Sequence, residues 1–581
     1  MKLYYKLIKE AHGPQMANTT KGRQSLTGQH MKMKQGTERT TTTVELEARW
    51  VEHFRELFNQ PGILGDGVDL CLPAQQAVNL TIRTGPFDIA ELTVAIKDMN
   101  NDKAAGLDGY GIEMEKYVAG EQYLQLELAM YNAILISGTM PAMLRDVIIT
   151  VLYKGKGPRD NCDSYRGISL MSHKGKLLER MLLNRLKPAL GDLIPANQFG
   201  FTEKCGTADA ILISRLLGID ATKRHTGLVR GYIDLTKAYD KVNREVLWKI
   251  LRLYGVPEEI VVVIIAFHEA ARAVLQLNGE VSPTKIPLNR GLKQGSVLSP
   301  ILFNIFFGVL TREFEKRCAE KSSADTILGV QVQYNMDNGF MDDSQLQRRK
   351  HGMRTATIVD VLYADDCVLF TNTIRSMQIM MVEFDEVATL FGMELAITKT
   401  KVVCNQYSKA MEIEEREAEE TSMPTPAQHD TRGSRELTRM QTNDRTLFVP
   451  AILIRKEKIE VVPQFRYLGV LDTDDGALDM EIQARICRMK QRFKEFEGRI
   501  FCNNEVSTLP RLQVFKCMVL TNGIYASEVW NYTRKGMDRL EKHYFRLLRS
   551  TLFLAKYDTT YLTYKGWSNY TRSNATRNGN N

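Results

Sequence analysis

The sequence predicts an α+β protein of several lobes, for three reasons. Its 581 residues are enough for several domains at roughly 150 residues each. Helical and strand-like apolar patterns alternate along most of the chain, whereas the spacing from Glu481 onward is almost wholly helical. Charged residues make up 25% of the chain and hydrophobic residues 44%, which is typical of globular proteins and excludes a largely disordered chain.

The N-terminal part contains one clear helical pattern. Residues 1–45 are polar and show little periodicity, which predicts a flexible lead-in. Leu46, Trp50, Phe54 and Leu57 then recur at intervals of three or four and predict an amphipathic helix that ends before a Pro-Gly pair.

The middle of the chain alternates between strands and helices. Apolar runs predict a buried strand at residues 145–153 and a second strand at residues 228–235. The segment 103–109 (KAAGLDG) predicts a loop. Helical spacing predicts helices over residues 173–190, 239–254, 300–317 (largely buried) and 380–390.

A hairpin and an insertion are predicted next. Residues 357–363 and 367–372 are β-rich runs separated by Ala-Asp-Asp, a spacing that predicts a tight hairpin with acids at its tip. A strand is predicted at residues 397–404. Residues 408–445 are first acidic and then rich in Pro, Thr and Arg, which predicts a disordered insertion.

The positive charge is concentrated in two zones. Residues 481–565 contain 16 Lys and Arg against 8 Asp and Glu, and residues 141–190 contain 10 against 4, whereas the whole chain carries only +8. Two basic zones around a neutral middle favour a polymer of phosphates over a small anion as partner. If the charge is considered by itself, a solubilising surface of Lys and Arg explains it equally well.

Membrane, secretory and zinc-site classes find no support in the sequence. No run reaches the roughly 18 apolar residues of a membrane span, and the first residues contain no long apolar segment of a secretory signal. The nine Cys form no Cys-x-x-Cys pair. We therefore expect an intracellular, reduced protein without a membrane partner.

Three acids are candidates for metal chemistry. Asp234 ends the strand at 228–235, and Asp365 and Asp366 lie at the predicted hairpin tip. Carboxylates at strand ends of one sheet can converge, and an acidic pair in a tight turn requires a cation or full hydration. Such a cluster supplies the oxygen ligands of two Mg²⁺ ions. The alternative is two unrelated surface turns.

The following segments occur in order along most of the chain: ARWVEHFRELFN (48–59), KAAGLDGYGIEMEKY (103–117), LYKGKGPRDNCDSYRGISL (152–170), NQFGFTEKCGTADAI (197–211), IDLTKAYDKV (233–242), GLKQGSVLSP (291–300), LYADDCVLF (362–370), FGMELAITKTK (391–401), FRYLGV (465–470) and SEVWNY (527–532). In these motifs and their order, the chain resembles a known family, the reverse transcriptases of non-LTR (LINE-type) retrotransposons.

The resemblance implies a right-hand polymerase with α/β fingers, a palm with a small, mostly antiparallel sheet, and a helical thumb. It divides the chain into the following parts: an N-terminal lead-in and helix (1–85), a fingers region (86–230), the reverse transcriptase core of fingers and palm (144–405), the disordered acidic insertion (406–450), the primer grip (451–475) and a basic helical thumb (476–581).

The resemblance also implies a role for each acid of the palm. Asp234 and Asp365 would bind two catalytic Mg²⁺ ions, which Mn²⁺ could replace, with Asp366 beside them and the backbone carbonyl of Leu235 assisting. Lys399 would be the general acid that protonates the departing pyrophosphate, a role for which Lys401 competes.

Further residues would bind the incoming nucleotide. Lys154, or Lys156 in its place, and Arg166 would hold the triphosphate. Tyr239 would be a steric gate that excludes a ribose 2′-hydroxyl and so selects dNTPs. Two residues, Gln294 and Gly295, would line the nucleotide and template side. The primer grip would consist of Phe465, Tyr467, Leu468 and Gly469.

Two departures from the family pattern keep an alternative open. Thr202 and Cys205 stand where the family commonly has basic residues, and neither an endonuclease domain nor a Cys/His knuckle is found. We expect a fragment of a larger element-encoded protein that copies an RNA template from a DNA primer or target, with other element-encoded proteins as candidate partners. Nuclear access is expected, with a ribonucleoprotein in the cytoplasm as a further location. The alternatives are a catalytically silent RNA-binding relic, or an intron maturase or telomerase-like enzyme.

Overall fold

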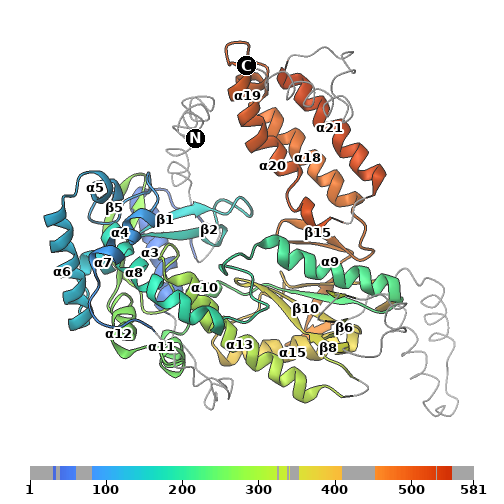
Figure 1. The fold of residues 1–581 in the computed structure, drawn as a ribbon, viewed down its shortest axis with the longest axis horizontal. Helices are drawn as coiled ribbons and strands as arrows, with labels where there is room; N and C mark the ends of the chain where they lie inside the picture. Colours follow the sequence, from blue (N-terminus) through green and yellow to red (C-terminus); the bar gives the residue numbers. More distant parts are fainter. Residues whose placement is uncertain are drawn as a thin grey trace, which may run out of the picture. The chain divides into compact units, whose positions relative to one another are not determined.

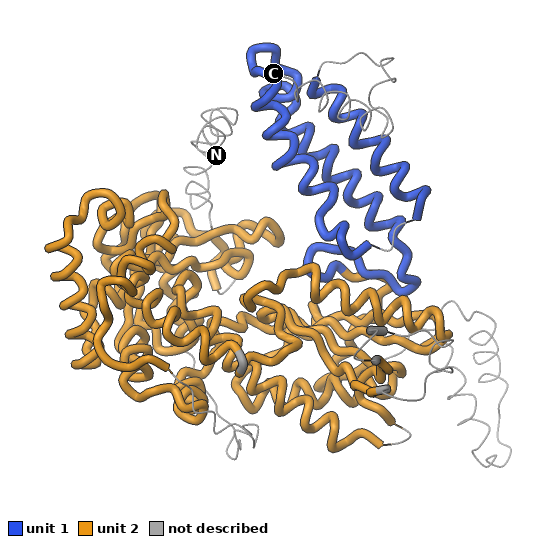
Figure 2. The backbone as a smooth tube through the Cα atoms, viewed as in Figure 1, with its two compact units in different colours: residues 1–25, 466–581 blue, residues 26–465 orange. Residues whose placement is uncertain are grey.

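Helices and small sheets of both strand orientations make up the structure, a computed structural model that describes residues 31–34, 39–59, 82–323, 326–335, 339–340, 353–408, 452–530 and 533–552. The α+β class predicted from the sequence is therefore observed (Figure 1). The chain divides into two compact units, residues 26–465 and residues 466–581 together with 1–25 (Figure 2). The predicted insertion lies outside the described residues except for its first three positions, and most of the predicted lead-in lies outside them as well.

The centre of the larger unit is a six-stranded sheet with the order β12-β13-β11-β3-β10-β9. All neighbouring strands are antiparallel except β11 and β13. Every residue of β3 is buried, including Arg230. The strands of this sheet are β3 (Val229–Ile233), β9 (Asp360–Tyr363), β10 (Asp366–Thr371), β11 (Lys401–Cys404), β12 (Ile452–Ile454) and β13 (Glu457–Val461).

Helices of the larger unit pack on this sheet and on one another. α15 contacts β3, β10 and β12, α13 packs against α15, and α9 contacts β9 (Figure 1). The helices of this unit are α3 (Thr43–Asn59), α4 (Ile89–Asp98), α5 (Ile112–Tyr117), α6 (Glu121–Ser137), α7 (Ala142–Arg145), α8 (His173–Leu190), α9 (Thr207–Arg224), α10 (Ala238–Lys241), α11 (Arg244–Leu253), α12 (Glu258–Ala266), α13 (Ser299–Lys321) and α15 (Ile374–Leu390), with short 3₁₀ turns at Cys162–Ser164 and Gly191–Leu193.

A second sheet of the larger unit has the order β2-β1-β4-β5. α3 packs on β5, so the amphipathic helix predicted near the N-terminus covers this sheet. The third sheet has the order β7-β6-β8. The strands of these sheets are β1 (Val147–Tyr153), β2 (Tyr165–Leu170), β4 (Arg272–Leu277), β5 (Glu280–Pro287), β6 (Val330–Asn335), β7 (Gly339–Phe340) and β8 (Met353–Ile358).

Several predicted elements are shorter than expected; among them, the strand predicted at 357–363 is divided between β8 and β9, which belong to different sheets. The helix predicted at 239–254 is split into α10 and α11, because the side-chain oxygen of Asn243 accepts hydrogen bonds from the N–H groups of Glu245 and Val246 and begins a new helix. The strand predicted at 397–404 begins only at Lys401, since the N–H groups of Lys399 and Thr400 both donate to the Ala396 carbonyl in a turn (2.9 Å each).

The smaller unit is helical around its own apolar core, as its sequence pattern predicted. The side chains of Glu481 and Arg485 form a buried ion pair on its first long helix, and Arg485 also donates to the Gly469 carbonyl. Its elements are β15 (Val470–Thr473), which pairs with β14 (Gln464–Tyr467) at the boundary, then α18 (Asp479–Phe496), a π-helical segment (Glu497–Phe501), α19 (Thr508–Val514), a second π-helical segment (Phe515–Leu520), α20 (Thr521–Gly523), a 3₁₀ turn (Ser527–Val529) and α21 (Arg534–Leu552). Among the described helices of the chain, none has the length and apolarity required to cross a membrane.

Candidate active site

Asp234 lies directly after the central strand of the six-stranded sheet. The chain leaves β3 at this residue, and Lys237, which has a left-handed φ of 52°, precedes the short helix α10. The Asp234 carbonyl accepts a hydrogen bond from the Ala396 N–H (2.8 Å), and Leu235 forms a bridge with Leu395. The end of β3 is therefore fixed on one side by the segment that precedes β11.

The second and third acids approach Asp234 from the neighbouring hairpin. Tyr363 pairs with Asp366, so the turn between β9 and β10 consists of Ala364 and Asp365 alone. Asp366 begins β10 and is not in the turn, which corrects the predicted placement of both acids at the tip. Because Cys367 of β10 pairs with Ile233 of β3, Asp366 and Asp234 occupy adjacent strand ends.

The three carboxylates affect one another electrostatically. Burial, followed by the charges of Asp365 and Asp234, raises the pKa of Asp366 to about 6. The pKa of Asp365 is also raised, chiefly by burial and further by Asp234, whereas Arg166 lowers it. Lys399 compensates part of this charge, since its Nζ lies 3.3 Å from Asp234 Oδ1 in an exposed ion pair. The structure thus brings together the acids that are 131 residues apart in sequence.

The arrangement fits divalent cations that have oxygen ligands in addition to these carboxylates. Carboxylates that raise one another's pKa are destabilised by proximity, and a bound cation relieves that repulsion. Within the described residues, no group of three or more Asp, Glu, His or Cys side chains could hold a metal ion on its own. Backbone carbonyls, water or substrate oxygens would therefore have to complete the coordination.

Cations of the β1–β2 hairpin lie near the acids. Lys154 Nζ donates to the Asp163 carbonyl (2.7 Å), and burial together with the charges of Lys399, Arg166 and Lys237 lowers the pKa of Lys154. The sequence reasoning missed Lys237, whose Nζ lies 2.9 Å from Asp163 Oδ1. The sequence feature that could have identified Lys237 is its position three residues after Asp234.

The two pairs of alternative lysines differ in their surroundings. Lys401 donates to Glu460 Oε2 and to the Thr398 carbonyl (2.7 Å each), so it is engaged away from Asp234, and Lys399 alone of the two contacts that acid. Lys156 lowers the pKa of Asp366. Lys154 lies near other cations, and burial and these charges lower its own pKa. The choice between Lys154 and Lys156 thus stays open.

The residues predicted to surround the nucleotide lie next to one another. Gln294 donates through Nε2 to both Asp240 carboxylate oxygens (3.2 and 3.3 Å), and its carbonyl accepts from the Ser169 N–H of β2 (2.8 Å). Gly295 has a φ of 129°, and a Cβ there would lie 2.5 Å from the Ser169 carbonyl. Glycine is thus required by the approach of β2, a reason that the sequence did not indicate.

The predicted primer-grip residues fall on both sides of the boundary between the units. Phe465 stacks on Tyr232 of β3, with ring centroids 4.4 Å apart. Tyr232 lies two residues before Asp234. In the smaller unit, the Leu468 carbonyl accepts from the Tyr525 hydroxyl (2.9 Å), Gly469 is bound by Arg485, and Tyr467 is buried.

Gln198 is a site residue that sequence reasoning placed in a motif without a role of its own. Its Oε1 accepts from the Ala364 N–H (2.9 Å) and its Nε2 donates to the Ala364 carbonyl (3.2 Å), so one buried amide holds the residue before Asp365. Ala364 has a left-handed φ of 56°. A Cβ on Gly200 would lie 2.2 Å from the Ala364 nitrogen, which explains the glycine. This motif therefore supports the acidic turn.

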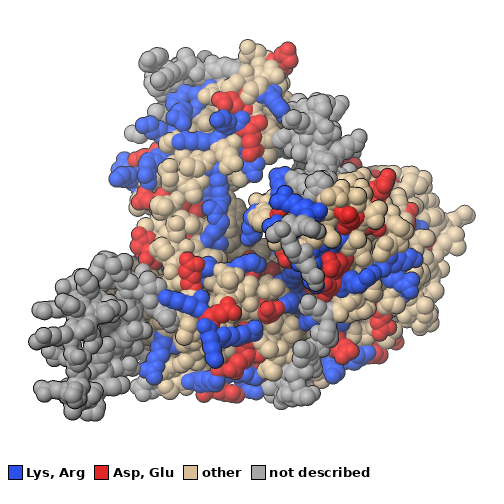
Figure 3. Space-filling model, turned by 180° about the vertical axis from the view of Figure 1, so that it is seen from behind, with Lys and Arg blue, Asp and Glu red and all other residues tan. Residues whose placement is uncertain are grey.

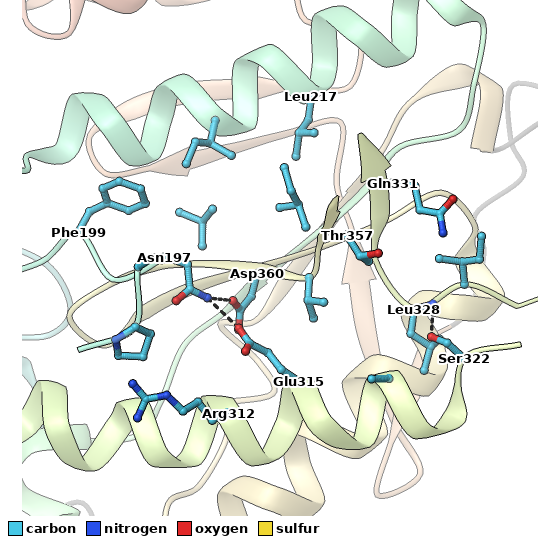
Figure 4. A pocket seen from close by; sticks show the side chains of 18 of the residues that line it. Asn197, Phe199, Leu217, Arg312, Glu315, Ser322, Leu328, Gln331, Thr357 and Asp360 are labelled. Atoms are coloured by element: carbon cyan, nitrogen blue, oxygen red, sulfur yellow. Dashed lines mark hydrogen bonds between the residues drawn. The ribbon is translucent and has the colours of Figure 1, made fainter. Parts of the chain in front are cut away.

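A cavity of about 1170 Å³ lies at the other end of β9 and contains none of the three acids. Figure 4 shows Asn197 directed toward the carboxyl groups of both Asp360 and Glu315, to which its amide donates. Burial and the neighbouring carboxyl raise the pKa of Asp360, and burial raises that of Glu315. The lining is otherwise largely apolar and offers no converging charges for nucleotide chemistry.

The last helix of the smaller unit carries a regular basic stripe. Figure 3 shows Lys and Arg side chains on the surface of this unit, interspersed with acids. On α21, Lys or Arg occupies positions 535, 539, 542, 546 and 549. The intervals between these positions alternate between four and three residues. This spacing places all five on one face of the helix. Arg539 pairs with Asp479, whereas Lys542 and Arg546 are exposed.

Residues 154–471 match the family model described as reverse transcriptase (RNA-dependent DNA polymerase), which is more than half of the chain. The matched range contains the three acids, the β1–β2 cations and Gln198.

The chain is also similar to polymerases of mobile elements. It is 33% identical over 190 residues to the RNA-directed DNA polymerase from mobile element jockey of Drosophila melanogaster, covering 32% of this chain and 20% of that protein. It is 28% identical over 234 residues to the probable RNA-directed DNA polymerase from transposon BS of the same species, covering 39% and 25%. A third match, at 26% over 275 residues, is the Pol polyprotein from type-2 retrotransposable element R2DM, covering 47% and 22%. The aligned part thus spans about a fifth to a quarter of each relative.

Proposed function

The chain belongs to the reverse transcriptase (RNA-dependent DNA polymerase) family, as its ordered motifs predicted, and on that premise we propose that it extends a primer 3′-hydroxyl with dNTPs on an RNA template. The observation that carries the proposal is the convergence of Asp234, Asp365 and Asp366 at adjacent strand ends, with cations of the β1–β2 hairpin nearby. In this proposal the larger unit provides the fingers and palm, and the smaller unit provides the thumb.

The reaction is an in-line phosphoryl transfer. The primer 3′-hydroxyl gives up its proton to water and its oxygen forms a bond to the α-phosphorus of the dNTP, while the bond from that phosphorus to the bridging oxygen breaks and pyrophosphate leaves. Asp234, Asp365 and Asp366, with the Leu235 carbonyl, would hold two Mg²⁺ ions, or Mn²⁺ in their place. These ions would lower the pKa of the attacking hydroxyl and stabilise the leaving oxygen.

The chain's own cations hold the triphosphate and supply a proton. Arg166 and Lys154 neutralise the phosphate oxygens, and Arg166 is near enough to lower the pKa of Asp365. Lys399, whose Nζ lies 3.3 Å from Asp234 Oδ1, would donate a proton to the leaving pyrophosphate. Gln294 and Gly295 form the wall between β2 and α10 against which the nucleotide lies.

The remaining predicted roles concern the sugar and the nucleic acid. Tyr239 excludes the ribose 2′-hydroxyl and so selects dNTPs. Phe465, Tyr467, Leu468 and Gly469 position the primer terminus, and the basic helices hold the duplex through its phosphates. The partners are an RNA template, a DNA primer or target, and other element-encoded proteins. The location is intracellular with nuclear access.

The test compares two aspartates of one hairpin. Asp365→Ala should abolish primer extension on an RNA template while RNA binding is retained, because the carboxylate that faces Asp234 is lost. Asp360→Asn, at the other end of β9, should retain extension, since the Asp360 carboxyl lies in the separate cavity beside Glu315. Extension by purified Asp365→Ala, or no extension by the unmodified chain, would contradict the proposal; the latter result would favour the silent RNA-binding relic.

A further inference from the structure

The ring of Tyr239 is held in a stack of three aromatic rings. Its centroid lies 4.3 Å from that of Phe303, and the two planes are inclined by 10°. Phe303 in turn stacks on Phe307, with centroids 5.5 Å apart and planes inclined by 18°. Phe303 and Phe307 are four residues apart on α13, and both are completely buried. Tyr239 is the partly buried end of the stack, and Phe303 and Phe307 lie in the protein core.

Within the part of the chain that the structure describes, no hydrogen bond fixes the orientation of this ring. The Tyr239 hydroxyl oxygen is buried and has no hydrogen-bond partner among the described residues. The hydrogen bond from the Leu292 N–H to the Tyr239 carbonyl (2.9 Å) fixes only the backbone. Because α10 is a single turn of four residues, the helix itself restricts the side chain little. Among the aromatic rings of the described residues, the Phe303 ring is the one that lies parallel to the Tyr239 ring.

We propose that Phe303 is a positioning residue for sugar discrimination, an inference that rests on the proposed function and on Tyr239 as its gate. A steric gate excludes a 2′-hydroxyl only if its ring is held in place. Phe303 is flat, fully buried and stacked on the side of Tyr239 that faces α13, so it prevents the ring from tilting toward the core. A branched aliphatic side chain at position 303 offers no parallel face, and the Tyr239 ring gains room to yield to a ribose.

The experiment compares two leucine substitutions on α13. Phe303 and Phe306 are both 0% exposed on the same helix, but Phe306 makes an edge contact with Phe391 (5.8 Å, 87°) and does not stack on Tyr239. For purified full-length Phe303→Leu and Phe306→Leu, kcat/KM would be measured for one dNTP and the matching rNTP on an RNA template. The ratio of kcat/KM for the dNTP to kcat/KM for the rNTP measures sugar discrimination, and it does not depend on the fraction of enzyme that is active.

The ratio should fall by about five- to tenfold in Phe303→Leu, the factor expected for loss of one aromatic stack, and stay within about twofold of the unmodified protein in Phe306→Leu. Tyr239→Phe, which keeps the ring, should also keep the ratio. Phe303→Met, of similar volume, provides the same test if the leucine variant does not fold. Equal ratios in Phe303→Leu and Phe306→Leu would overturn the inference while leaving polymerase activity standing. An unmodified chain that used dNTPs and rNTPs equally would overturn the gate itself.

Discussion

At the scale of single residues, Asp240 joins two parts of the site through one buried carboxyl group. It is 7% exposed and accepts both hydrogen bonds from Gln294. Burial raises its pKa to about 6, although Lys237, Gln294 and Lys154 act in the opposite direction. The folded protein therefore favours the protonated acid, and ionisation of Asp240 reduces stability. This cost is absent below about pH 4, grows between pH 4 and 6, and is complete above pH 6.

Asp240→Asn should remove that pH-dependent cost while its amide oxygen still accepts a hydrogen bond from Gln294. The stability of the variant relative to the unmodified protein should therefore improve by about 1 kcal/mol between pH 5 and pH 7.5. Urea unfolding at the two pH values measures this change, with exposed Asp98→Asn as the control for loss of one aspartate. A relative stability that does not rise with pH would mean that Asp240 is fully hydrated when ionised.

At the scale of elements, the β9–β10 hairpin depends on a segment that lies far from it in sequence. The Phe199 N–H donates to the Leu362 carbonyl and the Leu362 N–H to the Asn197 carbonyl (2.9 Å each), so residues 197–200 lie along β9 as an additional edge. Gln198 then holds Ala364 in its left-handed conformation, which is unfavourable for a residue with a Cβ. The position of Asp365 follows from these contacts.

Gln198→Leu should lower kcat by roughly 10- to 100-fold and raise the Mg²⁺ concentration needed for half-maximal extension, because the turn that carries Asp365 loses both hydrogen bonds. Template–primer affinity should change little. Asn405→Leu is the matched control: its buried amide also bonds backbone groups, the Leu228 N–H (3.0 Å) and the Thr226 carbonyl (2.9 Å), at the far end of β3. If both variants lose activity equally, Gln198 acts only through general stability.

The elements also show which parts of the fold sequence patterns could predict. The strand β3 and the hairpin around Asp365 were predictable, since strand-forming runs and the Ala-Asp-Asp spacing between two such runs are local signals. Strands β4 and β5 were not predicted: the β5 sequence EVSPTKIP contains two prolines and few apolar residues, and pairing with β4 and packing of α3 maintain it. Here tertiary contacts outweigh local propensity.

The candidate site was predictable where its residues lie in local sequence motifs, and it was not predictable where contacts join residues far apart in the sequence. Asp234, Asp365 and Asp366 carry a signal in their neighbours along the chain, whereas the Gln198 contact to Ala364 spans 166 residues and the Phe303 stack on Tyr239 spans 64. Glutamine and phenylalanine are also ordinary in a loop and in a buried helix. Only the three-dimensional arrangement distinguishes them from other residues of their type.

At the scale of the whole molecule, the net charge of +8 conceals an uneven distribution of charge along the chain. The acids converge in the larger unit, while the smaller unit carries the basic stripe of α21, which in the proposed function contacts the phosphates of a duplex. Contacts of this kind release counterions, so affinity falls with salt in proportion to the number of phosphates that are neutralised. The salt dependence of binding therefore counts the contacts that the stripe makes.

A pair of double variants separates such local contacts from overall charge. Lys542→Gln/Arg546→Gln removes two exposed cations of the stripe, and Lys97→Gln/Lys249→Gln removes two exposed cations of α4 and α11 in the larger unit. Affinity for an RNA–DNA hybrid would be measured by titration at several salt concentrations. The slope of log K against log salt should become shallower by roughly 2 for the stripe variant, at about 0.9 per lost contact, and stay unchanged for the other variant. Equal changes in both slopes would show that the duplex responds to net charge, and the stripe would then have no special part in holding it.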